Sequence, residues 1–359
     1  MKQQDIDYST ITREILGIAK QFGFLEARIT NIKISDDAQT KFLSWIKNNF
    51  HGDMQYITRN INLRFNPATL HENTVSIICI KAPYLTNNIN YHKNRLKENN
   101  AYISSYALGR DYHKVVKNNL KRYAEEINNY LANINLKHSF RVFTDSAPIL
   151  EIELAKKAGL GWRGKNTLLI NKDEGSMFFL GEIFTNLPLL ENTSEVKNHC
   201  GSCHKCIDIC PTKAFIEPYL IDAKKCISYL TIENQGPIPL EFRKAIGNRI
   251  YGCDDCQLFC PWNKFSKQTT LNDFNVRHNL DNISLNEAFS WDHNTWQEKM
   301  QGSSIYRIGY NNWLRNLAVA LGNAKTTPEI ISALKSKLNY ENTIIQEHII
   351  WALKQHGAM

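Results

Sequence analysis

The sequence predicts an α+β protein built from three successive segments, over residues 1–190, 191–265 and 266–359. Three observations support this division. The first segment alternates apolar residues at helical spacing with short continuous apolar runs that are typical of strands. The second segment contains eight of the nine cysteines of the chain. The third segment has helical spacing throughout, and a chain of 359 residues is long enough for two or three domains.

The elements of the first segment follow from these periodicities. Ile11, Ile15, Ile18 and Phe22 lie on one face of an expected N-terminal helix. The run VSIICI at 75–80 predicts a buried strand, in which Cys79 is a core thiol because free cysteine prefers burial. The other expected elements are a helix over 111–131, a strand over 140–144, a helix over 148–158 that ends before glycine, and strands over 167–170 and 177–184.

The second segment carries two runs of cysteines and one isolated cysteine. The eight are Cys200, Cys203, Cys206, Cys210, Cys226, Cys253, Cys256 and Cys260. The first run has the spacing C-x₂-C-x₂-C-x₃-C-P of bacterial ferredoxins, in which the cysteine before proline binds the other of two four-iron four-sulfur clusters. The spacing therefore predicts a ferredoxin-like domain with two 4Fe-4S clusters and a role in electron transfer.

The rule that the cysteine before proline binds the other cluster assigns the ligands of each cluster. Cys210 precedes a proline and goes to the second cluster, and by the same logic Cys260, which also precedes a proline, goes to the first. Cys226 is the spare thiol of this region and fills the remaining place. Cluster one is then Cys200, Cys203, Cys206 and Cys260. Cluster two is Cys210, Cys226, Cys253 and Cys256.

Two alternatives remain open for these cysteines. Zinc also binds Cys-x₂-Cys pairs, and disulfides form in exported proteins. Residues 1–24 alternate polar residues where a signal peptide would need an apolar run, and no apolar run is long enough to span a membrane. We therefore expect a cytoplasmic protein with no membrane partner, whose reduced thiols are free to bind iron.

The charge balance is basic. The chain has 43 Lys and Arg against 35 Asp and Glu, a net charge of +8, which favours a polyanionic partner; a lysine-rich drift in composition would give the same value. One row of cations follows the face of the expected helix at 111–131, with His113 and Arg122 beside it. The row, either a solvated face or a phosphate-binding face, consists of Arg110, Lys114, Lys117 and Lys121.

The stretch GLGWRGKN at 159–166 satisfies G-x-G-x-x-G and nearly satisfies the P-loop pattern. A phosphate-binding loop must leave a strand and open a helix. This loop is expected to leave a helix and enter a strand, and Asn166 replaces the magnesium-binding hydroxyl. We therefore do not expect it to bind a nucleotide. Its glycines allow a tight turn in which the backbone approaches a large ligand.

Asp145 stands at the end of an expected strand, just before Pro148 begins a helix. Active-site carboxylates often lie at such positions in layered folds, and aspartate is also a preferred helix N-cap. On position alone, capping is the favoured interpretation.

The third segment contains a weak repeat. RNLAVALGNA at 315–324 resembles EHIIWALKQH at 347–356 at an offset of 32 residues, with another apolar helix between them. This pattern predicts a truncated HEAT-like helical repeat, and an ordinary amphipathic tail explains it equally well. A fragment this short cannot bury its own core, so we expect it to pack on the rest of the protein.

Several ordered motifs together resemble the epoxyqueuosine reductase family, cobalamin-dependent enzymes of tRNA queuosine synthesis. The resemblance covers about residues 8–265, and the C-terminal helices resemble the helical-repeat tail of part of that family. The motifs are GDMQY at 52–56, YALGRDYH at 106–113, DSAP at 145–148, GLGWRGKN at 159–166, CISYLT at 226–231 and both cysteine runs.

The resemblance implies a nitroreductase-like first domain that binds base-off cobalamin, with the two clusters supplying its electrons. It implies cobalamin contacts from Arg59, Asp145, Leu169 and Leu180, and it makes Asp145 the general acid rather than a helix cap. A carboxyl shielded beside an apolar corrin can keep its proton near neutral pH and protonate the oxygen of an opening epoxide.

The implied reaction is the reduction of epoxyqueuosine to queuosine at the wobble position of tRNA, the last step of queuosine biosynthesis. The implied partners are tRNA carrying epoxyqueuosine in its anticodon loop, held in part by the row of cations, and an external low-potential electron donor; we expect a monomer. Two other functions share some of these features. A reductive dehalogenase also combines cobalamin with two clusters but is generally exported, and an electron-carrier subunit would bind no corrin.

Overall fold

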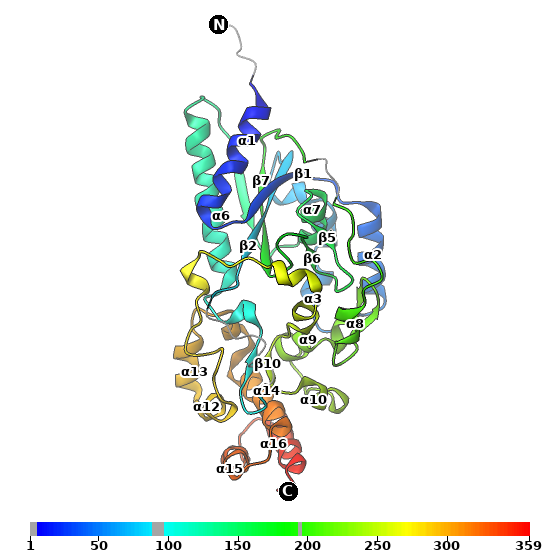
Figure 1. The fold of residues 1–359 in the computed structure, drawn as a ribbon, viewed down its shortest axis with the longest axis vertical. Helices are drawn as coiled ribbons and strands as arrows, with labels where there is room; N and C mark the ends of the chain where they lie inside the picture. Colours follow the sequence, from blue (N-terminus) through cyan, green and yellow to red (C-terminus); the bar gives the residue numbers. More distant parts are fainter. Residues whose placement is uncertain (1–5, 88–96, 193–195) are drawn as a thin grey trace.

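The computed structural model describes residues 6–87, 97–192 and 196–359. The molecule is elongated, with a sheet and its covering helices at the N-terminal end, the cysteine-rich segment in the middle and the C-terminal helices at the other end (Figure 1). Of the two expected segment boundaries, residue 190 lies in a loop, and residue 265 is the last residue of a short 3-10 helix. Among the described residues, no helix is long and apolar enough to cross a membrane.

A four-stranded antiparallel sheet organises the first segment. Its strand order is β1 (Glu26–Asn31), β2 (Ser76–Pro83), β7 (Phe178–Thr185) and β4 (Phe140–Phe143). Strand β2 is buried along its whole length, because it is an inner strand covered on both faces. This explains why its sequence is a continuous apolar run rather than an alternating one.

The two faces of β2 belong to two different cores, as the two-residue period of a strand requires. Ile78 and Ile80 pack with one core, and Ile77 and Cys79 pack with the other. Cys79 is fully buried, so the expectation of a core thiol is confirmed.

Helices α1 (Tyr8–Ile18) and α6 (Tyr112–Ala132) cover one face of the sheet, and α7 (Glu151–Lys157) covers the other (Figure 1). Asp7 and Asp111 cap the first two helices through their side chains. Smaller elements complete this segment: η1 (Ala19–Phe22), α2 (Asp36–Lys47), α3 (Gln55–Thr58), α4 (Ile61–Phe65), η2 (Pro67–Leu70), β3 (Tyr102–Ile103), η3 (Ser105–Ala107), β5 (Trp162–Arg163) and β6 (Leu169–Ile170).

The helix expected over 148–158 begins three residues late, at Glu151. Residues 145–148 form bends and residues 149–150 have no regular structure, and Asp145 has a left-handed φ of 56°. The side chain of Glu151 accepts a hydrogen bond from the backbone N–H of Asp145 at 2.5 Å. The first turn of the expected helix is therefore a loop that presents Asp145.

Short elements dominate the cysteine-rich segment, as expected for loops that hold clusters. They are α8 (Lys205–Asp208), β8 (Phe215–Glu217), β9 (Leu220–Ile221), η4 (Ala223–Lys225), α9 (Ile227–Ile232), α10 (Leu240–Ile246), β10 (Arg249–Tyr251), α11 (Asp255–Leu258) and η5 (Pro261–Phe265). Strand β10 pairs in parallel with β3 of the first segment. The buried carboxylate of Asp254 secures this junction by accepting hydrogen bonds from the Tyr102 hydroxyl (3.0 Å) and the Ser105 backbone N–H (2.7 Å).

The third segment is helical, with α14 at its centre. Its elements are η6 (Asn272–Phe274), α12 (Leu285–Ser290), α13 (His293–Met300), η7 (Ser304–Ile308), α14 (Gly309–Asn323), α15 (Pro328–Ser336) and α16 (Thr343–Gln355). The two sequences of the weak repeat lie on α14 and α16, which pack together through Leu317, Leu321 and Ile349. The same core includes Ala101 and Leu108 of the first segment, so the segment packs on the rest of the chain as expected.

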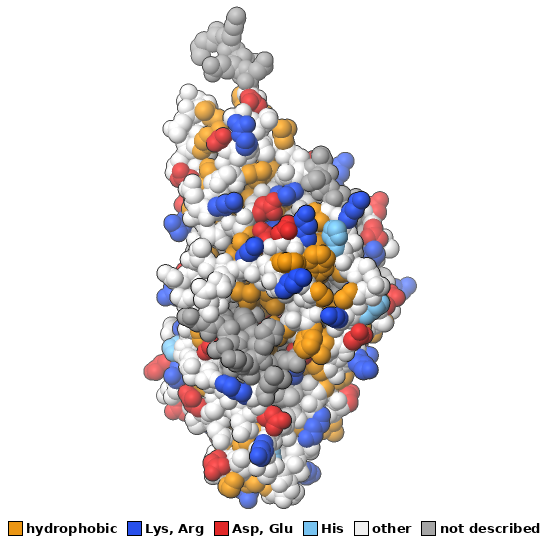
Figure 2. All heavy atoms as spheres, viewed as in Figure 1, with side chains coloured by type: hydrophobic (Ala, Val, Ile, Leu, Met, Phe, Trp, Pro, Cys, Tyr) orange, Lys and Arg blue, Asp and Glu red, His pale blue; other side chains and the backbone are white. Residues whose placement is uncertain are grey.

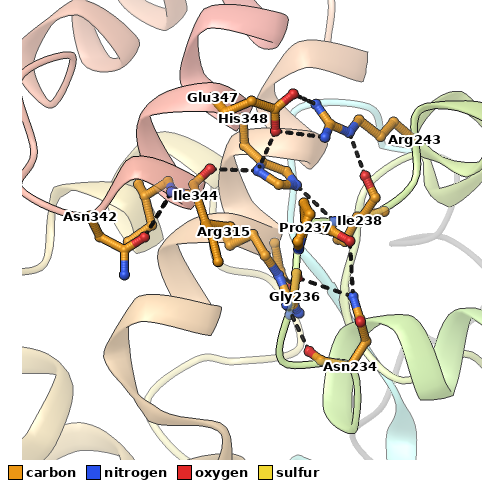
Figure 3. A network of polar contacts seen from close by, with 12 residues as sticks. Asn234, Gly236, Pro237, Ile238, Arg243, Arg315, Asn342, Ile344, Glu347 and His348 are labelled. Atoms are coloured by element: carbon orange, nitrogen blue, oxygen red, sulfur yellow. Dashed lines mark hydrogen bonds and ion pairs between the residues drawn. The ribbon is translucent and has the colours of Figure 1, made fainter. Parts of the chain in front are cut away.

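A buried polar network fastens these helices to the loop that follows α9 (Figure 3). Arg315 on α14 donates to the carbonyl oxygens of Asn234 and Gly236, both at 2.7 Å, and of Leu230 at 3.0 Å. On α16, His348 Nε2 accepts the backbone N–H of Ile238 at 3.1 Å. Helix α9 begins directly after Cys226, so this network holds one cysteine-bearing loop in place.

A second pair of side chains closes the same network. Arg243 on α10 donates two parallel hydrogen bonds to the carboxylate of Glu347 on α16, at 2.8 and 2.7 Å, and its guanidinium lies over the ring of Trp351. Bidentate pairs of this kind fix geometry as well as adding energy. The C-terminal helices therefore have a defined orientation on the cysteine-rich segment.

Candidate active site and cluster centres

The first group of cysteines gathers around Trp162 of β5. Cys260 packs with Trp162 and Cys200, and the indole N–H of Trp162 points at Cys200 Sγ at 3.4 Å. Burial and the neighbouring thiols of Cys260, Cys200 and Cys203 raise the pKa of Cys206 to about 11. The structure thus brings together the four cysteines that the sequence assigns to cluster one, including the crossing Cys260.

The second group lies close to the first, since Cys206 is among the thiols that act on the pKa of Cys256. Cys226 and Cys253 pack against the same apolar cluster. Burial raises the pKa of Cys226, with Cys210 as the neighbouring thiol, and burial also raises the pKa of Cys256, with Cys253 and Cys226 nearby. The four cysteines assigned to cluster two are therefore neighbours as well.

The glycine-rich loop at 159–166 contacts the loops that carry cysteines of both groups. These contacts, and not phosphate binding, are what the structure shows for it. It leaves α7 and enters β5, as expected. Lys165 Nζ donates to the carbonyl oxygens of Gly201 (2.7 Å) and Cys203 (3.1 Å), and Asn166 Nδ2 donates to that of Cys256 at 3.4 Å. A Cβ on Gly161 would lie 2.3 Å from the Ile170 carbonyl oxygen, so the glycine permits close pairing of β5 with β6.

A cavity lies between the sheet and the cysteine-rich segment, and one side of it is strongly apolar. That side is formed by Tyr84, Tyr106, Tyr112, Leu169, Phe178, Phe179 and Leu180. The opposite side includes all four cysteines of the second group. A flat apolar cofactor bound here would be in direct contact with cluster two.

Asp145 lies at the edge of this cavity, next to the start of α6. Its Oδ2 accepts a hydrogen bond from the hydroxyl of Tyr112, a cavity residue, and lies 2.9 Å from His113 Nε2. The other ring nitrogen of His113 lies 2.7 Å from Asp111 Oδ1. Asp145 does not cap α7, because the N-cap position belongs to Leu150; the capping interpretation is wrong.

This arrangement places the proton on the histidine. Burial alone would lower the pKa of His113, but its hydrogen bonds to Asp111 and Asp145 raise it to about 9. Burial would raise the pKa of Asp145, but hydrogen bonds from His113 and Tyr112 and the charges of His113 and Arg307 hold it below its ordinary value. These contacts favour the ionised form of Asp145 beside a charged His113, whereas the neutral carboxyl was expected beside a bound corrin.

Two further carboxyl groups lie beneath the Asp145 loop. Burial and the charge of Asp145 raise the pKa of Glu151 to about 8. Burial and the charge of Glu151 raise the pKa of Glu182, a fully buried residue of β7, well above its ordinary value. Both shifts favour the neutral forms of these carboxyl groups, which lowers their repulsion of the Asp145 carboxylate.

The rim of the site includes residues from the second and third segments. Arg307 of η7 forms an ion pair with Glu233, which follows α9. Tyr56, which is 53% exposed, lies near both, because the charges of Glu233 and Arg307 act on the pKa of its hydroxyl. The C-terminal segment thus contributes a cation to the surroundings of Asp145.

The remaining predicted site residues divide into those that line the cavity and those that do not. Leu169 and Leu180 line the cavity. Arg59 is an exposed residue at the C-cap of α3 and is not among the described residues that line it. The row of cations is exposed along α6, and Arg110 lies 3.4 Å from Asp273. His113, grouped with that row in the sequence, points toward Asp145 instead.

The sequence did not predict that Tyr112, His113 and Glu151 contact Asp145. It also did not predict that the ion pair of Arg307 and Glu233 lies at the rim of the site. One signal for the first group was available, because the run DYH at 111–113 begins the helix that packs beside β4, the strand that ends two residues before Asp145. No comparable signal identifies Arg307, which reaches the site only through the packing of a distant segment.

Two family models match parts of the chain. Residues 199–263 match a 4Fe-4S double cluster binding domain, which favours iron–sulfur clusters over zinc or disulfides. Residues 64–146 match the model described as epoxyqueuosine reductase.

Curated relatives match almost the whole chain. The epoxyqueuosine reductase of Pseudomonas aeruginosa is 42% identical over 351 residues, covering 98% of this chain and 96% of the relative. That of Escherichia coli is 44% identical over 352 residues, covering 98% and 91%.

Solved structures show the same fold. Epoxyqueuosine reductase from Streptococcus thermophilus has a TM-score of 0.85 at 28% identity, covering 98% of this chain and 91% of that one. An epoxyqueuosine reductase solved with an epoxyqueuosine-modified tRNA stem loop has a TM-score of 0.81 at 23% identity, covering 98% and 100%.

Proposed function

Because the chain belongs to the epoxyqueuosine reductase family, we propose that this oxidoreductase reduces the epoxide of epoxyqueuosine in tRNA and leaves the cyclopentene of queuosine. The reaction consumes two electrons and two protons and releases the oxygen as water. The observation that carries the proposal is a single cavity with an electron source on one side, the cluster-two cysteines, and a proton source at its edge, the pair of Asp145 and His113.

The electron route follows from the positions of the two cysteine groups. All four cysteines of cluster two line the cavity, and none of cluster one's is among its described lining residues. Cluster two is therefore the last donor before the substrate site, and cluster one is the entry point for electrons. The segment that carries them matches a double cluster domain, whose cubanes exchange single electrons.

The cavity suits base-off cobalamin. Its apolar side would face a corrin, and Leu169 and Leu180 belong to that side. When bound, cobalamin supplies a cobalt centre that can take electrons from cluster two and reduce a carbon–oxygen bond. The chain itself provides the apolar walls, excludes water and sets the distance to the cluster. Arg59, which is outside the described lining of the cavity, is proposed as a peripheral contact of this cofactor.

Asp145 delivers the proton in this proposal, and His113 stores it. At neutral pH His113 carries hydrogens on both ring nitrogens, since both lie within hydrogen-bond distance of carboxylate oxygens. As negative charge develops on the epoxide oxygen, the proton on His113 Nε2 moves to Asp145 Oδ2 and from there to the substrate. Such positioned proton transfer typically contributes about 10²–10⁴-fold in rate.

The substrate nucleotide must be splayed out of the anticodon loop to reach this cavity. Exposed Tyr56 and the Arg307–Glu233 pair surround the entrance, and the row of cations on α6 is available to hold flanking phosphates. The tRNA stem loop bound by a related reductase and the net charge of +8 support tRNA as the substrate.

Replacing Asp145 with Asn tests the proposal. The amide keeps the size of the carboxylate but cannot pass on a proton, so we expect at least about a 100-fold loss of turnover. The measurement is mass analysis of the nucleosides of an epoxyqueuosine-containing stem loop after reaction with the reduced holoenzyme. Cobalt content and cluster absorbance should stay at the wild-type level.

Asp173→Asn is a matched control, because Asp173 is an exposed aspartate away from the cavity, and it should retain full activity. Full activity in Asp145→Asn would remove Asp145 from the role of proton donor. Wild-type enzyme that binds the stem loop but leaves its epoxide intact would overturn the reaction itself.

A further inference from the structure

A second, open pocket lies on the outer surface of the cysteine-rich segment, where α8, α11 and η5 meet. Its volume is about 730 Å³. Its walls include Ile209, Leu258 and Phe259, and lysines 205 and 264 stand at its edge. This pocket belongs neither to the cofactor cavity nor to the surroundings of Asp145, since Tyr112, His113 and Glu151 are not among its described lining residues.

The described lining of the pocket includes a cysteine assigned to cluster one and none of those assigned to cluster two. Cys260 is the cluster cysteine among its described lining residues, and Cys260 packs with Cys200 and Trp162 of the first group. The two clusters therefore face two different spaces. Cluster two faces the inner cavity, where the chemistry occurs, and cluster one faces an opening to solvent.

The surface around the pocket combines apolar and basic side chains. Phe259 and Phe265 are each 40% exposed, and Lys264 Nζ lies 4.7 Å from the centre of the Phe265 ring. Figure 2 shows apolar side chains gathered with Lys and Arg side chains, and with some Asp and Glu side chains, in the region where α8 lies in Figure 1. Exposed apolar patches of this kind mark interaction sites on soluble proteins.

The charges of the two cysteine-bearing stretches are almost all of one sign. Over residues 196–213 and 256–268, the described exposed acid is Asp208. Against it stand the exposed lysines 197, 205, 213, 264 and 267. A partner that docks here would therefore be attracted if its own docking face is acidic, because complementary charge steers encounter and fixes orientation.

We propose that this pocket and its lysine rim are the docking site for an acidic, low-potential electron-carrier protein that reduces cluster one. The inference rests on the proposed function, which needs two electrons for each epoxide. Each docking transfers one electron, so that the carrier is oxidised by one electron and cluster one is reduced by one. Two dockings supply one turnover, and the protons come from the site of Asp145.

The tRNA substrate fits this surface less well than a carrier protein does. A nucleotide bound at the pocket would lie beside Cys260 instead of Asp145 and could not present its epoxide to the proton donor. The apolar centre with a charged rim matches the small, transient interfaces of redox partners, which bury less than about 1,200 Å². Contact beside a cluster-one ligand is useful only to a partner that exchanges electrons.

The test reverses the charge at the rim with the double variant Lys205→Glu and Lys264→Glu in the reconstituted holoenzyme. Two reductants are compared: a reduced flavodoxin as the acidic carrier, and photoreduced deazaflavin as a small neutral reductant that needs no docking face. The readouts are the rate at which cluster absorbance bleaches and the turnover of an epoxyqueuosine stem loop. A second double variant, Lys20→Glu and Lys335→Glu, makes the same charge change at exposed positions outside the cysteine-rich segment.

We expect the rim variant to raise the KM for flavodoxin at least tenfold and to flatten the salt dependence of cluster reduction. Its reaction with deazaflavin, and every property of the control variant, should stay within twofold of wild type. Unchanged reduction by flavodoxin would overturn the docking site. An equal loss with both reductants, or weaker stem-loop binding, would assign the lysines to folding or to tRNA. If deazaflavin-reduced wild type left the epoxide intact, the proposed function would fail while the bleaching rates still tested the docking site.

Discussion

The polar network around Asp145 and the polar network around Arg315 differ in what their groups face, although both contain a histidine and a carboxylate. In the first network the Asp145 side chain is 52% exposed and lies at the edge of a cavity. In the second network the Glu347 side chain is similarly exposed, at 48%, but Arg243 donates two hydrogen bonds to it, and Arg315 and His348 are buried and bonded to backbone groups (Figure 3). An open network can act on a ligand, whereas a closed one fixes the positions of the segments it joins.

The two histidines show the physical basis of this contrast. His113 lies between two carboxylates, whose hydrogen bonds outweigh burial and raise its pKa to about 9. His348 lies between the carbonyl oxygen of Ile344 (2.7 Å) and the backbone N–H of Ile238, and burial together with the charge of Arg243 lowers its pKa to about 4. The first histidine is charged at neutral pH and the second is neutral.

The largest effect is expected when the closed network is broken. Arg315→Met removes the guanidinium donors to the carbonyl oxygens of Leu230 and Asn234 and one of the two donors to that of Gly236, which keeps the Asn234 side-chain amide. Buried acceptors without donors cost about 1–3 kcal/mol each, so we expect a loss of about 3 kcal/mol in the free energy of unfolding. Urea unfolding of the holoenzyme measures this change.

Arg13→Met is the matched control, because Arg13 is an exposed residue of α1, and it should change the stability by less than about 0.5 kcal/mol. A loss below 1 kcal/mol in Arg315→Met would contradict the structural role assigned to the closed network.

A substitution in the open network should change the turnover rate more than the free energy of unfolding. His113→Gln keeps a hydrogen-bond donor toward Asp145 but cannot carry a proton. We expect turnover to fall about 100-fold, with stem-loop binding unchanged. The wild-type rate should also decline as pH rises through about 9, where His113 loses its charge, and this decline should be absent from the variant. His293→Gln, at an exposed position of α13, is the control. A variant that kept the wild-type pH profile would exclude His113 as the proton store.

The smallest effect, on the order of 1 kcal/mol, is on the free energy of unfolding, to which the two histidines contribute with opposite dependence on pH. The folded pKa of His113 lies above its unfolded value of 6.5, so its stabilising contribution is present below pH 6.5 and is lost as pH rises through about 9. The folded pKa of His348 lies below 6.5, so its contribution is present above pH 6.5 and is lost as pH falls toward about 4. Unfolding midpoints of His113→Gln and His348→Gln, each compared with wild type across pH, should show these two trends. Parallel trends would refute the contrast between the networks.

The sequence predicted the parts of the molecule that depend on local pattern. The apolar run around Cys79 identified a buried strand because the two faces of that strand lie in two cores. Cysteine spacing identified a two-cluster segment, because the ligand runs of 4Fe-4S clusters are local in sequence; the division of the cysteines between the clusters, with the crossing of Cys210 and Cys260, stays a prediction. The helix at 111–132 was found because its buried residues recur at helical spacing.

The parts that were missed depend on contacts between distant residues. Asp145 was assigned to a helix cap on position, since the competing hydrogen bonds come from Tyr112 and His113 on another helix. Its ionised state in this structure could not be inferred, because it depends on the balance of burial against those two bonds and the charge of Arg307. Arg307 itself lies in the third segment, where no local pattern marks it.

The fastening of α16 to the loop after α9 has a consequence for the order in which the protein matures. A ribosome releases the eight cluster cysteines well before it releases His348, and the loop after Cys226 lacks this C-terminal anchor until then. The loop after Cys226 is therefore held in its final position only after His348 has been made and α16 has packed against it. A cluster that loaded before that point would meet a ligand loop without its C-terminal anchor.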